Sequence, residues 1–295
     1  MIKQEIITIL PLKLREVICE YTNSFSEDDI EEIRLRCNRP VLLIGGKGET
    51  ELNTILGEKD LREAMEYISG YSLYAYEEQL KEGFITIRGG HRIGVAGRVV
   101  AENEKVKTIK NISSLNIRIS HEVLGCSDGI IKYINGNILI ISPPRMGKTT
   151  LLRDILRNIS ETEGQSVGIV DERSEIAACY MGIPQNNLGP RCDVLDCCPK
   201  TIGMMLLLRS MSPTYIGVDE LGTKDDIDSI KQVIKGGAYV AATIHGESID
   251  DLMKKKHLKE IFELKLFDTY IEISKKGLKR SMAIYNKALE RVEET

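Results

Sequence analysis

The chain has 295 residues, of which 42% are hydrophobic and 28% charged, a balance that indicates a soluble globular protein and excludes a largely disordered one. Its 40 basic and 44 acidic residues leave a formal net charge of −4, so no global basic field indicates nucleic acid as a partner. No apolar run approaches a membrane span and no signal-peptide core is present, so we expect a cytoplasmic protein.

The cysteines favour a reduced protein. There are seven of them, an odd number, and none forms a C-x-x-C pair. Cys192, Cys197 and Cys198 cluster, but no histidine is near them in the sequence, so we favour buried thiols over the alternative of a zinc site.

Residues 1–122 are predicted to form a small α+β domain. An amphipathic helix is expected over 6–18, followed by a strand pair at 32–36 and 41–44 and a helix over 61–73. Three further strand-like runs, at 83–88, 92–100 and 115–119, are punctuated by glycines. These runs predict a small sheet.

Residues 123–295 are predicted to form a second domain of the α/β class. Short continuous apolar runs at 138–141, 167–170, 215–218 and 239–244 alternate with helical segments. Such runs are typical of parallel strands that are buried on both faces. A hairpin is expected near the end of the chain, from strands at 269–273 and 281–285 joined by Lys275-Lys276-Gly277.

A phosphate-binding loop follows the first of these strands, in the segment NILIISPPRMGKTTLL at 137–152. Gly147, Lys148 and Thr149 match the end of the pattern G-x-x-x-x-G-K-[ST], and Ser142 stands where the first glycine is expected. Backbone N–H groups and a helix N-terminus bind the anion in such a loop. Ser142 therefore has only to end the strand, which does not require glycine. Lys148 can reach the β and γ phosphates and the Thr149 hydroxyl can ligate magnesium.

Two apolar strands end in pairs of acids, Asp171-Glu172 and Asp219-Glu220. Ligands bind at the carboxyl ends of strands in such sheets, so we expect both pairs to face the phosphates. An aspartate there can hold hydrated magnesium, and a glutamate can orient or deprotonate the attacking water. The alternative for each pair is a solvated cap on its strand.

His245 ends the strand at 239–244 and is followed by a glycine. Its place at a strand end predicts a contact with the γ-phosphate. A structural role is the alternative, because a lone histidine has many uses.

Several segments together resemble a known family. They are 170–176, 182–186, 193–196, 208–213 and 242–246 in the second half, with 32–36 and 113–118 in the first half. They resemble the stage III sporulation protein AA family, which is similar to the hexameric ATPases of type II and type IV secretion systems. The resemblance implies a RecA-type P-loop NTPase core with a smaller N-terminal α+β domain.

The resemblance also implies roles for individual residues. The catalytic residues would be Lys148 and either Glu220, which we favour, or Glu172. Magnesium would be held by Thr149 and, through water, by Asp219. The residues expected to bind ATP are Ser142, Pro143, Pro144, Arg145, Met146, Gly147, Lys148, Thr149, Thr150 and His245, with Arg92, Arg98 and Arg118 donated by the N-terminal domain. A solvated strand face is the alternative for these three arginines.

The implied function is a magnesium-dependent ATPase, the motor of a sporulation-specific secretion-like channel at the membranes between mother cell and forespore. Implied with it are a hexameric ring, membrane-embedded channel subunits as partners, no nucleic-acid partner, and peripheral attachment to the inner face of the mother-cell membrane.

Two other functions are compatible with the same core. A hexameric nucleic-acid-translocating ATPase is one, since a basic segment lies at 254–257; stimulation of turnover by single strands, with steep salt dependence, would identify it. A nucleotide-gated scaffold that binds ATP without hydrolysing it is the other, and single-turnover hydrolysis measured beside ATP affinity would identify it.

Overall fold

The computed structural model of the chain describes residues 4–22, 30–46, 48–102, 104–255, 258–276 and 279–294. The chain separates into two compact units, Met1–His121 and Glu122–Thr295. Each unit is built on a sheet of its own. Within the described ranges, every helix is too short or too polar to span a bilayer.

The first unit is an antiparallel sheet with helices. Its helices are α1 (Gln4–Thr8), α2 (Leu12–Thr22), α3 (Glu58–Ile68) and α4 (Glu77–Lys81), with a 3-10 turn at Leu73–Tyr76. Its strands are β1 (Ile30–Arg36), β2 (Arg39–Gly45), β3 (Gly48–Leu56), β4 (Phe84–Ile87), β5 (His91–Glu102) and β6 (Lys105–Arg118). In the described residues the strand order is β3-β2-β1-β6-β5-β4, and α3 and α4 pack on the sheet.

Apolar and polar side chains alternate along β1, β6 and β5, which gives this sheet one apolar face and one polar face. Ile33, Ile117 and Ile93 are neighbours in register and are fully buried. The next positions, Arg34 and Asn116, belong to the opposite face, because successive side chains of a strand point to opposite sides. A hollow of about 370 Å³ opens there, lined in part by these two residues.

The structure confirms the strands expected in this unit but corrects its helices. The single helix expected over 6–18 is wrong: Pro11 lacks an N–H and disfavours helical backbone before it, so the segment divides into α1 and α2. The helix expected over 61–73 ends at Ile68, where Gly70 and Tyr71 take left-handed backbone, with φ of 56° and 62°.

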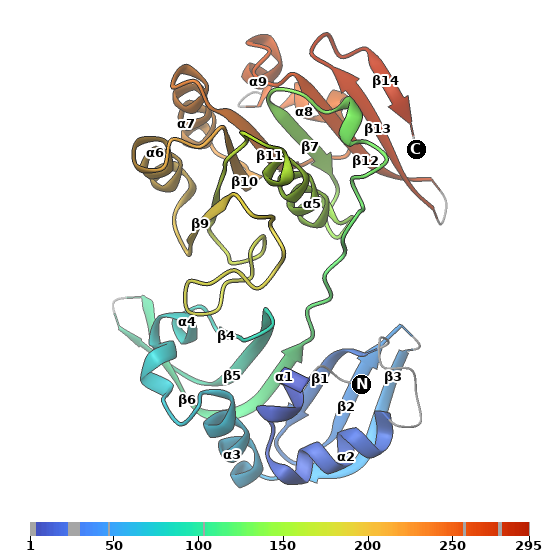
Figure 1. Cartoon of the computed structure of the whole chain (residues 1–295). Helices are drawn as coiled ribbons and strands as arrows, with labels where there is room; N and C mark the ends of the chain where they lie inside the picture. Colours follow the sequence, from blue (N-terminus) through green and yellow to red (C-terminus); the bar gives the residue numbers. More distant parts are fainter. Residues whose placement is uncertain are drawn as a thin grey trace. The chain divides into compact units, whose positions relative to one another are not determined.

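The second unit is an α/β structure (Figure 1). Its helices are α5 (Lys148–Glu161), α6 (Lys200–Ser210), α7 (Lys224–Lys235), α8 (Ile249–Lys254) and α9 (Lys259–Glu263), with a 3-10 turn at Ile131–Tyr133. Its strands are β7 (Ile138–Ser142), β8 (Val167–Asp171), β9 (Cys192–Asp196), β10 (Tyr215–Leu221), β11 (Tyr239–His245), β12 (Thr269–Lys276), β13 (Lys279–Asn286) and β14 (Arg291–Glu294).

The strand order in the described part of this unit is β14-β13-β12-β7-β11-β10-β8-β9. The neighbouring strands from β12 through β7, β11, β10 and β8 to β9 pair in parallel, whereas β13 pairs antiparallel with both β12 and β14. The predicted α/β class and the hairpin of β12 and β13 are therefore confirmed. Gly277, expected in the hairpin turn, lies outside the described residues.

Helices bury both faces of this parallel sheet, which explains why its strands are apolar throughout. In β7, Ile138 and Ile140 belong to a core shared with α5, whereas Leu139 and Ile141 belong to a second core shared with α6, α7 and α8. Figure 1 shows α5 lying against its face of the sheet.

Strand order brings the carboxyl ends of β7, β11 and β10 together. In register, Ser142 of β7 pairs with His245 of β11, and Ile244 pairs with Leu221 of β10. The loop after β7, the acid pair in β10 and the histidine of β11 therefore meet at one edge of the sheet.

Candidate active site

The loop of residues 142–147 connects β7 to the N-terminus of α5. Ser142 is the last residue of β7, fully buried, and its backbone is not left-handed, so this position does not require glycine. Left-handed backbone occurs instead at Arg145, with φ 61°, and at Gly147, with φ 79°. Such residues curl a loop so that successive N–H groups converge on one point.

Lys148, the first residue of α5, points toward the acid pair of β10 and the histidine of β11. Its Nζ lies 3.1 Å from Nε2 of His245 and 3.7 Å from Oε1 of Glu220. Nε2 of His245 is in turn 2.6 Å from the same Glu220 oxygen. A lysine from the start of α5, a carboxylate from β10 and an imidazole from β11 thus form one contact cluster.

Thr149 contacts the other acid of β10. Its hydroxyl donates to Oδ2 of Asp219 at 2.6 Å. Oδ1 of Asp219 accepts from the Thr243 hydroxyl and, at 3.0 Å, from the backbone N–H of Glu220. Donors from α5, β10 and β11 therefore fix this carboxylate beside the Thr149 hydroxyl, and hydroxyl and carboxylate oxygens are ligands that Mg²⁺ accepts.

Glu220 has a backbone conformation unusual for its residue type. Its φ is 59°, and the register between β10 and β11 shifts between Val218 and Leu221. Left-handed backbone at a residue other than glycine is disfavoured and is found at functional sites. Here the Thr243 hydroxyl accepts the Glu220 N–H at 2.9 Å, which holds the shifted backbone. The bulge turns the Glu220 side chain toward Lys148.

The charge of Glu220 is stabilised by its neighbours. Burial alone would raise the pKa of this carboxyl, but hydrogen bonding to His245 and the positive charges of Arg173 and Lys148 outweigh burial, and the pKa lies below its usual range. Arg173, which follows the first acid pair, forms an ion pair with Glu220. Glu220 is therefore ionised at neutral pH.

The two carboxylates of the first acid pair, Asp171 and Glu172, lie in different environments. The Asp171 carboxylate is 2% exposed and accepts the backbone N–H groups of Glu175, Ile176 and Ala177 at 2.8 to 2.9 Å, so it organises the loop after β8. Glu172 instead forms an ion pair with Lys200 of α6.

Glu172 and Glu220 border the same small hollow, together with Arg173 and Lys200. Its volume is about 10 Å³, enough for about one water molecule. Both candidates for the residue that activates water therefore face one water-sized space.

Asp171 makes the stability of the second unit depend on pH. Burial is the main cause that raises its pKa to about 6, against 3.8 ordinarily, and Asp196 on β9 adds repulsion. A pKa raised on folding stabilises the protein below about pH 4, and this contribution is lost as pH rises through about 6.

We therefore expect the unfolding free energy of the wild type, relative to that of Asp171→Asn, to fall by about 2 kcal/mol between pH 4 and pH 7. Urea denaturation of both proteins at each pH measures the difference. A difference that does not change with pH would contradict the raised pKa.

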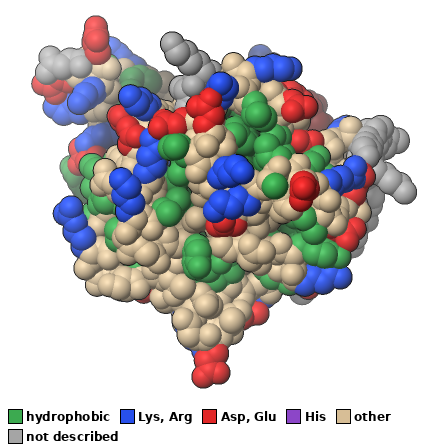
Figure 2. All heavy atoms as spheres, turned by 90° about the horizontal axis from the view of Figure 1, so that it is seen from above, with side chains coloured by type: hydrophobic (Ala, Val, Ile, Leu, Met, Phe, Trp, Pro, Cys, Tyr) green, Lys and Arg blue, Asp and Glu red, His purple; other side chains and the backbone are tan. Residues whose placement is uncertain are grey.

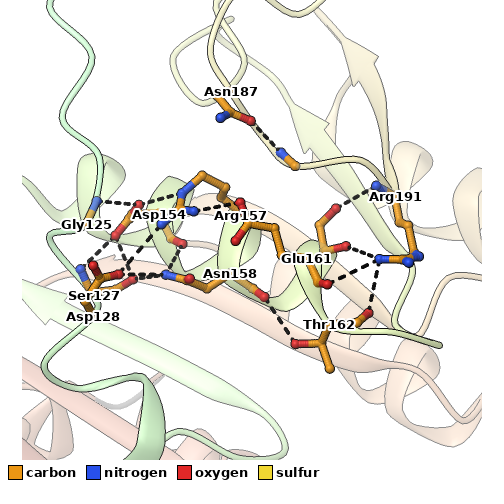
Figure 3. Close-up of polar contacts among 12 residues, drawn as sticks. Gly125, Ser127, Asp128, Asp154, Arg157, Asn158, Glu161, Thr162, Asn187 and Arg191 are labelled. Atoms are coloured by element: carbon orange, nitrogen blue, oxygen red, sulfur yellow. Dashed lines mark hydrogen bonds and ion pairs between the residues drawn. The ribbon is translucent and has the colours of Figure 1, made fainter.

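The helix that begins at Lys148 is fixed to neighbouring segments by buried polar contacts (Figure 3). Asp154, 1% exposed, accepts the N–H groups of Gly125 and Ser127 at 3.0 and 2.7 Å, and the Ser127 hydroxyl at 2.7 Å. Nε of Arg157 donates to the same carboxylate at 2.9 Å. The residues that follow the first unit are thereby attached to the helix that carries the phosphate loop.

The far end of α5 is held as well. The Arg191 guanidinium donates to the carbonyl oxygens of Ser160, Glu161 and Thr162, and its backbone N–H donates to the Ser160 hydroxyl (Figure 3). Because the Arg191 guanidinium binds unpaired carbonyls at the C-terminus of α5, this helix is anchored both at its middle and at its C-terminal end.

The arginines predicted from the first unit lie in β5 and β6. Arg92 and Arg118 are direct register partners, and the Arg92 guanidinium stacks on the Phe84 ring, 3.5 Å from its centroid. Arg98 lies past a register irregularity, opposite Lys110. Arg92 and Arg118 are therefore neighbours on one sheet face, whereas Arg98 is separated from them along the strand.

The structure thus brings Lys148, Glu220 and His245 into contact with one another, and Thr149 into contact with Asp219. Sequence reasoning assigned no role to three further residues around them: Arg173, Lys200 and Thr243. Arg173 and Thr243 stand within three residues of predicted site residues, and that proximity was the available signal. Lys200 carried no such signal, because only folding brings α6 to Glu172.

Other candidates from the sequence are not part of this cluster. The thiols expected to be buried differ in exposure, because Cys197 is exposed whereas Cys192 and Cys198 are half-buried. Burial raises the pKa of Cys192 to about 12, as expected of an unreactive thiol. In the described part of the chain, no group of three or more His, Cys, Asp or Glu is arranged to hold a metal ion. In the basic segment at 254–257, Lys255 pairs with Asp251 at 3.1 Å, and residues 256–257 lie outside the described residues.

Comparison with known proteins gives this geometry a context. Residues 1–292 match the model of a family described as Sporulation stage III, protein AA. The chain is 44% identical over 293 residues to stage III sporulation protein AA of Bacillus subtilis (strain 168), covering 96% of this chain and 95% of that protein.

Solved structures of an ATPase and of a pilus retraction motor share the architecture. The Yersinia pseudotuberculosis ATPase DotB has a TM-score of 0.64 and 15% identity, covering 94% of this chain and 80% of the DotB chain. The pilus retraction motor PilT, solved with bound ADP, has a TM-score of 0.61 and 15% identity, covering 90% and 81%. At this identity the likeness shows the fold, a RecA-type P-loop core with a smaller N-terminal α+β domain.

Proposed function

The chain belongs to the family of stage III sporulation protein AA, and from that premise we propose that it is an ATP-hydrolysing motor of a secretion-like channel complex in sporulation. The observation that carries the proposal is the cluster of Lys148, Glu220 and His245 beside a phosphate-binding loop. ADP bound to the similarly folded motor PilT supports a nucleotide as the ligand.

The residues present fit ATP and magnesium. The left-handed residues Arg145 and Gly147 curl the loop, and the N-terminus of α5 adds its unpaired N–H groups to the cradle. Thr149 would ligate Mg²⁺ directly and Asp219 would hold it through water, since this ion keeps several waters in most protein sites. The bound ion would neutralise charge on the phosphate oxygens.

The side chains of the cluster would divide the chemistry among them. Lys148 would exchange its contacts with Glu220 and His245 for the β and γ phosphate oxygens, which carry more negative charge. Glu220 would accept a hydrogen bond from the attacking water and hold it in line with the γ-phosphorus. Attack would form a bond from the water oxygen to phosphorus and break the bond to the bridging oxygen. ADP and dihydrogen phosphate would be released, with both protons of the water on the phosphate.

The lowered pKa of Glu220 defines its role further. A carboxylate with a low pKa is a weak base, so Glu220 would act mainly by orienting the water rather than by removing its proton early. His245, bonded to Glu220 through Nε2, would keep the carboxylate in place. Glu172 is the competing candidate because it borders the same hollow, but its ion pair is with Lys200 and not with the lysine of the phosphate loop.

Arginines of the first unit would complete the site. Arg92 and Arg118, paired in register, and Arg98 farther along β5 would supply positive charge to the transferring phosphate. An arginine in that position is worth about 10³ to 10⁵ in rate. Donation by a neighbouring copy would make turnover depend on assembly.

We propose that copies of the chain form a hexameric ring on membrane-embedded subunits of the sporulation channel. The protein would be cytoplasmic and peripheral, at the inner face of the mother-cell membrane. On the face drawn in Figure 2, basic and acidic side chains are interspersed, which fits a protein partner better than nucleic acid.

The test is the ATPase rate per chain, measured as phosphate release with Mg²⁺ over a wide range of protein concentration, beside light scattering. We expect a rate that rises as the chain assembles. A constant rate from a proven monomer would remove the need for residues from a neighbour.

The Lys148→Ala variant is expected to abolish turnover, because it removes the charge that reaches the β and γ phosphates. Lys235→Ala, at the exposed end of α7, is the matched control and should keep the wild-type rate. Equal turnover by Lys148→Ala and the control would contradict the proposed function.

A further inference from the structure

The hairpin of β12 and β13 places an arginine beside the phosphate loop. The two strands pair so that Ile271 faces Ile284, Ile273 faces Met282, and Lys275 faces Arg280. Because side chains alternate along a strand, Arg280, Met282 and Ile284 belong to one face. Ile284 is buried in the core that contains α5, and Met282 packs against that core. Arg280 therefore extends from the α5 side of the sheet.

Arg280 lies close to Gly147 of the loop. A Cβ added to this glycine would lie 3.0 Å from Nη1 of Arg280, 3.5 Å from Cζ and 3.6 Å from Nη2. The planar guanidinium thus lies against the residue that precedes Lys148. Met146, the preceding loop residue, packs against the same core as Met282, which keeps the loop and the hairpin adjacent.

A second observation places the same charge near the first turn of α5. The Arg280 guanidinium also acts on Cys126, where it partly offsets the burial that raises the pKa of this thiol to about 11. Cys126 Sγ is 3.7 Å from the carbonyl oxygen of Thr150. Lys148, by contrast, points to Glu220 and His245. The two cations therefore approach the loop from different directions.

We propose that Arg280 binds the phosphates of a nucleoside di- or triphosphate held by the loop 142–147 and the first turn of α5. Arg280 would contact the α and β phosphates, while Lys148 contacts the β and γ phosphates. This inference rests on the proposed function. It is supported by chemistry, because a guanidinium presents a fork of donors that matches phosphate oxygens and keeps its charge at any pH of interest. Arg280 is exposed, so its guanidinium is accessible to a ligand.

The test is equilibrium binding of ADP to the full-length wild type and to three variants, at fixed salt. Arg280→Gln should weaken ADP binding about tenfold or more, because hydrogen bonds to charged groups contribute about 1.5–3 kcal/mol. Arg280→Lys should recover part of the loss, since it restores the charge without the fork. Lys275→Gln, which removes one charge from the register partner of Arg280, is the control and should change affinity less than about twofold.

Tripolyphosphate, tested as a competitor of ADP, distinguishes phosphate from nucleoside contacts. It should also bind Arg280→Gln more weakly than it binds the wild type. Weaker ADP binding with unchanged tripolyphosphate binding would overturn the proposal, since Arg280 would then contact the base or ribose. Equal ADP affinity of Arg280→Gln and the wild type would overturn it too, with the proposed function intact. A wild type that binds no nucleotide would instead refute the proposed function, and this inference with it.

Discussion

Replacement of Glu220 by Gln is expected to lower the turnover number for ATP by about 10²-fold, with ATP still bound. Glutamine keeps the shape of the side chain but removes the charge that accepts a hydrogen bond from the attacking water. Hydrogen bonds to charged groups contribute about 1.5–3 kcal/mol, which corresponds to as much as about 10²-fold in rate. It also removes the anion shared by Lys148, Arg173 and His245. Phosphate release and ATP affinity, measured on one preparation, separate the loss of chemistry from a loss of binding.

The matched variant for this experiment is Glu172→Gln, because Glu172 borders the same hollow. We expect it to lower turnover much less, since the ion pair of Glu172 is with Lys200. The reverse ranking of the two variants would assign the water-orienting role to Glu172. Full activity in both would contradict a hydrolytic role for this hollow.

Replacement of Asp154 by Ala is expected to destabilise the second unit by about 3–5 kcal/mol, the range found when one partner of a buried ion pair is removed. Asp154 is 1% exposed, and its loss leaves the N–H groups of Gly125 and Ser127 and the largely buried guanidinium of Arg157 without this acceptor. Unpaired buried donors are costly. Urea denaturation followed by circular dichroism measures the change.

Asp128→Ala provides the control, because it changes an exposed carboxylate of the same network. Asp128 is 66% exposed and lies 3.7 Å from Nη2 of Arg157, so its loss should cost at most about 1 kcal/mol. A denaturation midpoint of Asp154→Ala equal to that of the wild type would show that Asp154 does not anchor the segment. If each variant lost several kcal/mol of unfolding free energy, Asp128 would contribute to the stability of this network as much as Asp154.

The pH dependence of the Asp154 contribution follows from its hydrogen bonds. Burial would raise the pKa of this carboxyl, but donors from Ser127, Arg157 and Gly125 outweigh burial and lower it. Stability from a lowered pKa is present above the ordinary pKa and is lost as pH falls below it. Asp154 and Asp171 therefore act in opposite directions in the acid range, although both are buried aspartates.

Features that depend on short stretches of residues were predictable. The strand, the loop with Gly147-Lys148-Thr149 and the helix after it are adjacent in sequence, so their order already specified a phosphate cradle. Strands buried on both faces must be apolar throughout, so β7, β8, β10 and β11 could be located from composition. Strands β3, β9 and β14 were missed because they lie at sheet edges and carry polar or acidic residues, which edge strands tolerate.

By itself, then, the sequence determined the α/β class, the phosphate loop, the acid pairs at strand ends and the resemblance to the family. Only the tertiary structure decided which acid meets the lysine. Strand β11 lies between β7 and β10, so His245 comes between Lys148 and Glu220. Asp171 and Asp219 occupy equivalent places in two strands, yet the chain after Asp171 folds back and binds its carboxylate with backbone N–H groups, whereas Asp219 meets Thr149. The role of a carboxylate depends on the donors that surround it after folding, and those donors come from segments distant in sequence.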